Sequence, residues 1–297
     1  MKRVVVAALA VALLAGCGVP AGTDGSLVDD WAAPKKAEMP VPALGACHRD
    51  VTYRTKLGIA SLLGHTSIDC AQQHLAETFF VGTFTGAAGA RTSAPGERSP
   101  EVRAVYTECS SRAKEFLGDD YHMAFVEVFI TVPNPAAWQG GARWYRCDLA
   151  RLTRDFVDPS IEPGYGSLKG TLAPGGSSRA DCFTITERSK TEVDTVPVAC
   201  TTAHNGEMAG VYYAPDTPVP NGDQAVGTFG EHCGPVVAAY AGLPNDRTLL
   251  GRVLYLYRWQ GEAEWARGNR AVQCYLWMKK PAAKLMKGAG PAAFPVS

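Results

Sequence analysis

The most constraining feature of this sequence is an eight-residue motif that occurs twice. Residues 70–77 read Cys-Ala-Gln-Gln-His-Leu-Ala-Glu, and residues 200–207 read Cys-Thr-Thr-Ala-His-Asn-Gly-Glu. Both copies follow the pattern Cys, three residues, His, two residues, Glu. Repetition of this kind indicates that a chain is built from related structural units.

The similarity extends to both sides of the motif. One cysteine precedes each copy and another follows it, namely Cys47 and Cys109 in the first, Cys182 and Cys233 in the second. Each copy ends with Trp, Arg and Cys at the same spacing. These residues are Trp138, Arg143 and Cys147 in the first copy, and Trp265, Arg270 and Cys274 in the second. We therefore expect two related modules, residues 43–150 and 181–278.

The amino terminus has the pattern of an export signal. Met1-Lys2-Arg3 is basic, and an unbroken apolar run from Val4 to Ala15 follows. This pattern predicts a signal peptide over residues 1–16. The run is shorter than the roughly 20 apolar residues that a spanning helix needs.

Leu-Ala-Gly-Cys, ending at Cys17, resembles the lipobox of bacterial lipoproteins. The resemblance implies that Cys17 carries a lipid and becomes the first residue of the mature protein. The alternative is an ordinary signal peptide with a chance cysteine. Residues 17–42 contain Gly, Pro, Ala, Lys and Asp with almost no periodicity, which predicts a flexible tether after the lipidated cysteine. We expect a protein on the extracytoplasmic face of the cell membrane, attached to the membrane by this lipid.

The remaining cysteines predict disulfides. Nine cysteines less Cys17 leave eight, four in each module. An even set in an exported chain favours disulfides, and the lack of any Cys-x-x-Cys pair disfavours a zinc site. Three connectivities are open within each module. We favour first with second and third with fourth, which gives Cys47–Cys70, Cys109–Cys147, Cys182–Cys200 and Cys233–Cys274.

The charge balance disfavours nucleic acid as a partner. The chain has 29 basic and 29 acidic residues, and loss of Lys2 and Arg3 with the signal peptide lowers the basic count to 27. A near-neutral protein without a basic run lacks the electrostatic attraction for phosphate backbones on which nucleic-acid-binding proteins depend.

Residue patterning predicts an α+β fold. Apolar residues at helical spacing predict helices over residues 101–117 and 229–240. The segments rich in β-branched and aromatic residues predict strands on either side of each helix. Each module is therefore expected to be a mostly antiparallel sheet with one helix. Dense Gly and Pro predict a linker over 151–180, and a Lys-, Ala- and Gly-rich end predicts a disordered tail over 279–297.

The His–Glu pairs of the motif have two interpretations. His74 with Glu77, and His204 with Glu207, could be metal ligands or an acid–base pair of an envelope enzyme. A lone His-x-x-Glu is a weak metal signal because it lacks the second histidine of zinc-protease helices. The favoured interpretation is structural: the histidine caps the turn after the cysteine, and the glutamate pairs with Arg143 or Arg270. We expect no catalytic residue, no metal and no cofactor.

The order of these motifs resembles the septum-formation family of actinobacterial envelope proteins. The resemblance rests on Asp181-Cys182-Phe183, the motif at 200–207, the helical Cys233 and the closing Trp265, Arg270 and Cys274. It implies a protein connected with cell division or the cell wall, and it supplies no catalytic residue. We expect a non-enzymatic binding or scaffold role, with division proteins, cell-wall proteins or peptidoglycan as partners.

Overall fold

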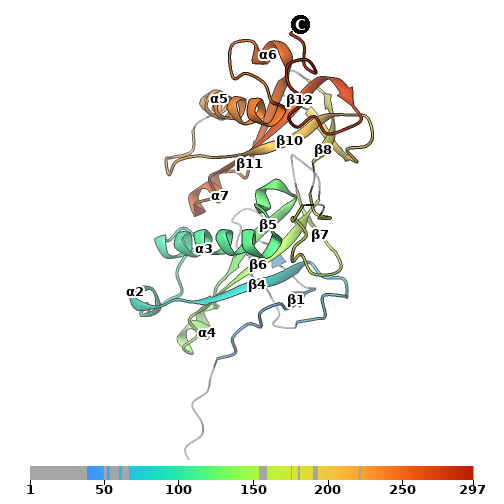
Figure 1. Ribbon diagram of the computed structural model, residues 1–297. Helices are drawn as coiled ribbons and strands as arrows, with labels where there is room; N and C mark the ends of the chain where they lie inside the picture. Colours follow the sequence, from blue (N-terminus) through green and yellow to red (C-terminus); the bar gives the residue numbers. More distant parts are fainter. Residues whose placement is uncertain are drawn as a thin grey trace, which may run out of the picture. The chain divides into compact units, whose positions relative to one another are not determined.

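The computed structural model describes residues 39–49, 52–53, 60–61, 67–153, 159–174, 176–179, 181–189, 193–220 and 222–296 (Figure 1). For residues 52–53, 60–61 and 222–226 it describes the backbone alone. The expected signal peptide, Cys17 and most of the expected tether lie outside these ranges. Within the described ranges, no helix combines the length and the apolar character that crossing a bilayer demands.

The first half contains a five-stranded antiparallel sheet. Its strands are β1 (Cys47–His48), β4 (Ala76–Thr83), β5 (Val126–Thr131), β6 (Trp144–Leu152) and β7 (Ile161–Glu162). The helical segments are α2 (Gly86–Gly89), α3 (Pro100–Leu117), the 3-10 turn η1 (Tyr121–Met123) and α4 (Pro135–Gln139). Two short strands, β2 (Thr52–Tyr53) and β3 (Ala60–Ser61), pair with each other apart from this sheet.

The second half contains another five-stranded antiparallel sheet. Its strands are β8 (Cys182–Glu187), β9 (Val193–Val198), β10 (His204–Tyr213), β11 (Leu254–Trp259) and β12 (Ala271–Ala282). The helices are α5 (Gly222–Ala241), α6 (Leu249–Arg252) and α7 (Glu262–Arg267). Two antiparallel sheets with few helices confirm the predicted α+β class.

The two sheets have the same order of equivalent strands. The first runs β1-β4-β6-β5, and the second runs β8-β10-β12-β11 with β9 added beyond β8. In both halves the Cys–His–Glu motif leads into a strand that pairs with the closing strand. This shared order agrees with the expectation of two related modules.

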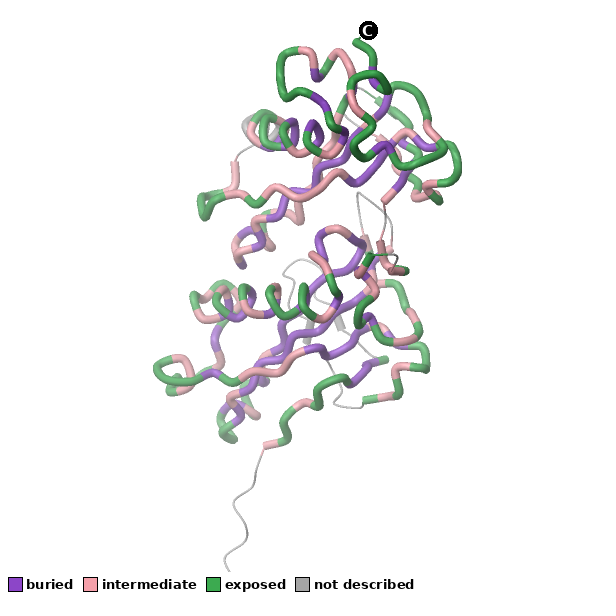
Figure 2. The backbone as a smooth tube through the Cα atoms, in the orientation of Figure 1, coloured by how far each residue is buried: buried purple, intermediate pink, exposed green. Residues whose placement is uncertain are grey.

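Each long helix packs on one face of its sheet because its apolar residues recur on one side. The buried residues of α3 are Val102, Val105, Tyr106, Cys109, Ala113 and Leu117. Ser99 caps the start of α3 by accepting a hydrogen bond from the Val102 amide at 3.2 Å. Gly118 ends it with a φ of 90°, a conformation that favours glycine. Figure 2 shows that the buried residues also concentrate along the central strands of both sheets.

Disulfides join the elements within each half. The bonded pairs are Cys47–Cys70, Cys109–Cys147, Cys182–Cys200 and Cys233–Cys274. These are the pairs that the sequence analysis favours. The second and fourth of them connect the long helix to the closing strand, with Cα–Cα distances of 5.7 and 5.3 Å.

Removing the helix-to-strand disulfide of the second half should weaken the fold substantially. Cys233→Ser/Cys274→Ser opens a loop with a separation of 41 residues, and we expect a loss of about 4 kcal/mol in the free energy of unfolding. The control Cys182→Ser/Cys200→Ser opens a separation of 18 residues and should cost about 3 kcal/mol. Urea denaturation of the oxidised proteins measures both. An unchanged midpoint in the first variant would contradict the expectation.

Two segments expected to be irregular are packed against the fold. In the expected linker, Leu168 and Leu172 are buried in the core under α3. In the expected disordered tail, Met286 and Phe294 are buried in the core of the second half. The prediction of a disordered tail over 279–297 is therefore wrong for the described residues up to 296.

The same backbone contacts hold both segments. The amides of Gly170 and Leu172 donate to the carbonyls of the last two residues of α3, each at 2.9 Å. The amides of Gly288 and Gly290 donate to the last two residues of α5, at 2.8 and 2.9 Å. Each structural unit therefore includes a closing segment after its last long strand. The sequence does not reveal that these closing segments are packed on the fold, because Gly- and Pro-rich segments satisfy their backbone groups through tertiary contacts that leave no periodic pattern.

A third hydrophobic cluster joins the two halves. Its buried members are Phe125 and Leu152 from the first half and Phe183, Ile185, Met208 and Tyr275 from the second. Phe183 meets Phe125 and Tyr275 edge to face, with ring centroids 6.3 and 5.7 Å apart. Met39–Ser297 accordingly forms one compact unit.

Candidate functional site

The His–Glu pair of the second half is a closed structural cluster. His204 Nδ1 lies 2.8 Å from the Thr202 carbonyl, and Nε2 lies 2.9 Å from Glu207 Oε1. Glu207 also accepts hydrogen bonds from the Tyr240 hydroxyl at 2.8 Å and from the Met286 amide at 2.9 Å. Both side chains have no exposed surface. The pair therefore ties the motif to α5 and to the closing segment, and it offers no access to a substrate.

The first half uses the same residues with one difference. His74 Nδ1 lies 2.9 Å from the Gln72 carbonyl, so the histidine caps the turn as it does in the second half. His74 Nε2 has no hydrogen-bond partner among the described residues, so Glu77 does not take the place that Glu207 has beside His204. Glu77 accepts from the Ser167 hydroxyl at 2.6 Å and the Leu168 amide at 2.7 Å. Both glutamates thus anchor the closing segment of their own half.

The expected pairing of these glutamates with Arg143 and Arg270 is wrong. The Arg143 guanidinium donates to the carbonyls of Gly89 and Trp138 and lies 4.2 Å from the Trp138 ring centroid. Arg270 lies 4.6 Å from the Trp265 ring centroid and donates to the Trp265 carbonyl. Arginine stacks well on an aromatic face because its planar cation is attracted to the ring electrons. The repeated Trp–Arg spacing therefore encodes a stacked pair rather than an ion pair.

The motif cysteines do not form a metal site with these residues. Ligand atoms of Cys182, His204 and Glu207 lie within 4.8 Å of one another, as do those of Cys47, Cys70 and Glu77. All the cysteines of both groups are in disulfides. Because the thiolate is the form of cysteine that binds metal, these groups lack the donor set that a metal would need.

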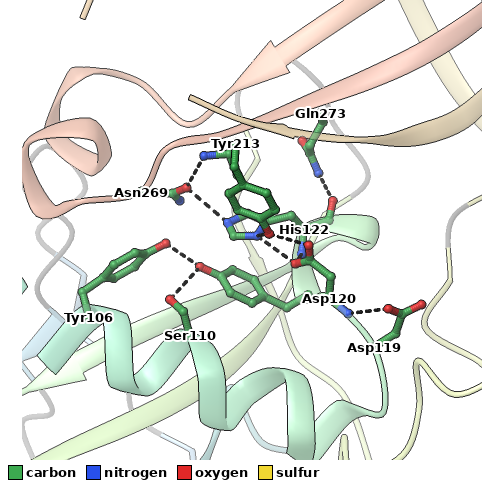
Figure 3. Close-up of polar contacts among 10 residues, drawn as sticks. Tyr106, Ser110, Asp119, Asp120, His122, Tyr213, Asn269 and Gln273 are labelled. Carbon is green, nitrogen blue, oxygen red and sulfur yellow. Dashed lines mark hydrogen bonds and ion pairs between the residues drawn. The ribbon is translucent and has the colours of Figure 1, made fainter. Parts of the chain in front are cut away.

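A buried polar network connects the two halves at His122. Its ring lies 2.9 Å from Asp120 Oδ1 through Nδ1 and 3.2 Å from Asn269 Oδ1 through Nε2 (Figure 3). The Asn269 oxygen also accepts from the Ala271 amide at 3.1 Å, which determines which way the Asn269 amide is oriented. Gln273 Nε2 donates to the His122 carbonyl at 2.5 Å. The junction is therefore held by directional bonds as well as by apolar packing.

Two carboxyl groups of this junction have shifted pKa values. Burial alone would raise the pKa of Asp120, but hydrogen bonds from His122 and Tyr213 and the charge of His122 lower it to about 2. Burial raises the pKa of Glu127, which the nearby charges of His122, Arg267 and Arg258 oppose. Glu127 is 7 % exposed. The junction thus contains one carboxylate that is strongly stabilised and one that is costly to ionise.

An open groove lies beside this network. It consists of three adjoining cavities of about 700, 460 and 330 Å³ that share lining residues. Arg270 lines all three. The first half contributes the start and outer face of α3, and the second contributes the loop 214–219, α7 and the residues before β12. The charged lining residues are Arg98, Arg103, Lys114, Asp120, Asp216, Glu262 and Arg270.

Asp216 lies between two arginines in this groove. Its carboxylate accepts from Arg103 of α3 at 2.6 Å and also from Arg270. These two hydrogen bonds lower the pKa of Asp216, although its side chain is 69 % exposed. The carboxylate thereby connects the two halves at the groove surface.

Two donor atoms of the groove have no hydrogen-bond partner among the described residues. They are Asn269 Nδ2 and Arg270 Nε, and both are buried. Asn269 lines one cavity together with Tyr106, Ser110 and Tyr121 of the first half, and Figure 3 shows the first two of these near it. Buried donors are normally satisfied, so these two leave hydrogen-bonding capacity unused beside the groove.

Among the residues predicted as sites, only Arg270 lines this groove. Cys17 lies outside the described residues, and the His–Glu motifs serve the interior of each half. Comparison of the two copies would have drawn attention to Asn269, because Ala142 occupies the same place after the shared tryptophan in the first copy. Asp216 and Arg103 carry no comparable signal, because only the fold brings them together.

A family model described as septum formation matches residues 55–274. The match covers more than half of the chain and spans both halves. The chain belongs to the septum-formation family. Membership supports a role in septum formation or cell division. Comparison with curated proteins found no match, and comparison with solved structures found none either.

Proposed function

We propose that this septum-formation protein is a lipid-anchored binding or scaffold protein on the extracytoplasmic face of the membrane. The observation that carries the proposal is the groove, which both disulfide-stapled halves line. Backbone elements braced by disulfides suit recognition because little of their conformational entropy is lost on binding. Division proteins, cell-wall proteins or peptidoglycan are the partners proposed.

The alternative of an enzyme or metal-dependent factor at the His–Glu pairs gains no support from their geometry. His204 and Glu207 have no exposed surface, and their polar atoms form hydrogen bonds with Thr202, Tyr240 and Met286. A catalytic pair must reach its substrate within hydrogen-bond distance. The motif instead stabilises the scaffold that presents the groove.

The proposed function predicts septal defects in cells that lack the gene. In the bacterium that makes the protein, deletion should delay or misplace septa, and a fluorescent fusion should concentrate at division sites. Time-lapse microscopy measures both. Normal septation in the deletion strain together with uniform distribution of the fusion would overturn the proposed role.

The proposed anchor predicts that Cys17 alone carries fatty acid. The exported wild-type protein should incorporate alkyne-tagged palmitate, and Cys17→Ala should lose the label completely. This readout does not depend on membrane retention, which an uncleaved signal peptide would also cause. Gly18→Ala is the matched control and should stay labelled. Equal labelling of Cys17→Ala and wild type would contradict the anchor.

A further inference from the structure

The groove offers more donors than its own residues use. Asn269 Nδ2 and Arg270 Nε are buried donors without a partner among the described residues. Lys114 and Arg98 line the same groove as cations, at its two ends. Donors of this kind bind ionised acceptors more strongly than neutral ones.

Asp216 shows which acceptor fits these donors. Its carboxylate sits between Arg103 and Arg270, one from each half. Because Asp216 belongs to the exposed loop 214–219, its carboxylate can leave the arginines at small cost to the fold. A carboxylate from another molecule can take the same place. Asp216 would then compete with the ligand for both arginines.

The size of the groove indicates a chain rather than a single ion. A water molecule fills about 30 Å³ of liquid, so a small inorganic anion would occupy a minor part of a cavity of about 700 Å³. The largest cavity also has apolar lining, from Pro218, Val219, Ala263, Trp265 and Ala266. Asp120 and Glu262 also line the groove, but its four cations lie apart beside apolar side chains, which matches a peptide that carries several carboxylates and some apolar side chains.

We propose that the groove binds an acidic peptide segment, whose carboxylates displace Asp216 from Arg103 and Arg270. This inference rests on the proposed binding function and names its ligand class. The bound peptide would run along α3 from Arg98 toward Lys114, with one carboxylate between the two arginines. Asp216 weakens binding in the free protein and so favours ligands that bring more than one carboxylate.

Asp216→Asn provides the sharpest test because it predicts a gain. The exported full-length protein is purified in detergent, and fluorescence anisotropy measures binding of a labelled hexaglutamate peptide. Asp216→Asn removes the competing charge and should raise the affinity about threefold to tenfold, which corresponds to the net contribution of one ordinary hydrogen bond. Misfolding cannot produce such a gain. An unchanged or lower affinity would overturn the role of Asp216.

Arg103→Gln should have the opposite effect. Loss of one guanidinium should weaken hexaglutamate binding about tenfold. Arg112→Gln is the matched control, because Arg112 lies on the same helix and lines none of the three cavities. Its affinity should stay at the wild-type value. Equal losses in both variants would point to non-specific attraction and overturn the groove as the site.

Two further probes separate the ligand classes. A labelled hexaglutamine peptide should not bind, and inorganic phosphate should displace hexaglutamate only at concentrations well above those of the peptide. Efficient displacement by phosphate would replace the peptide proposal with a simple anion site. If hexaglutamate binds neither wild type nor Asp216→Asn, the peptide proposal is overturned. The proposed function would not be affected, since the septal phenotypes test it independently.

Discussion

Glu207→Gln is expected to lower the free energy of unfolding by about 2–4 kcal/mol, because each buried donor left without its acceptor costs roughly 1–3 kcal/mol. Glu207 is fully buried and accepts from His204, Tyr240 and the Met286 amide. Glutamine keeps the shape of glutamate, but its amide nitrogen would face some of these donor groups, which need an acceptor. Urea denaturation measures the loss.

The same variant should also release the closing segment of the second half. The contact between Glu207 and the Met286 amide holds this segment on the fold, so its local unfolding should become easier. Trypsin should then cleave at Lys284 and Lys287 faster than in wild type. Glu231→Gln, on the exposed side of α5, is the matched control and should change neither stability nor cleavage. Wild-type stability in Glu207→Gln would show that the motif does not anchor the segment.

Phe183→Ala is expected to lower the free energy of unfolding by about 3–5 kcal/mol, the usual cost of removing a buried phenylalanine side chain. Phe183 is 1 % exposed and packs on Phe125 and Tyr275 in the cluster that joins the halves. Because each half also has its own core, the cavity should weaken the junction more than either half.

Calorimetry should therefore distinguish a loss of stability from a loss of unfolding cooperativity between the two halves. We expect one unfolding transition in wild type and two in Phe183→Ala, the second from a half that stays folded. Val196→Ala, on the neighbouring strand β9 and 58 % exposed, is the matched control and should keep one transition at the wild-type temperature. A single transition with the full loss of stability would show that the halves cannot fold separately.

Periodic and repeated features were the ones that the sequence predicted well. The helix over 101–117 is α3 at Pro100–Leu117, because apolar residues at helical spacing and Gly118 mark its face and its end. One of the segments rich in β-branched and aromatic residues forms β4 at Ala76–Thr83, as its composition predicts. The disulfide pairs follow from the same order of elements, since equivalent strands and helices bring equivalent cysteines together.

The errors share one physical cause. The Trp–Arg spacing was repeated, but spacing does not say whether arginine meets a carboxylate or an aromatic face. The closing segments around Leu168 and Met286 look irregular because scattered hydrogen bonds to a glutamate and to a helix end hold them, not a ladder of hydrogen bonds. Neither kind of contact leaves a periodic trace in the chain.

The sequence by itself contains the repeated motif, predicts the α+β class and the family, and favours the disulfide pairs, because these depend on residue types at regular or matching spacings. The tertiary structure alone decided the junction and the groove. Arg103 and Asp216 lie 113 positions apart, and His122 and Asn269 lie 147 apart. Each pair joins one half to the other, so the groove is a property of how the halves pack.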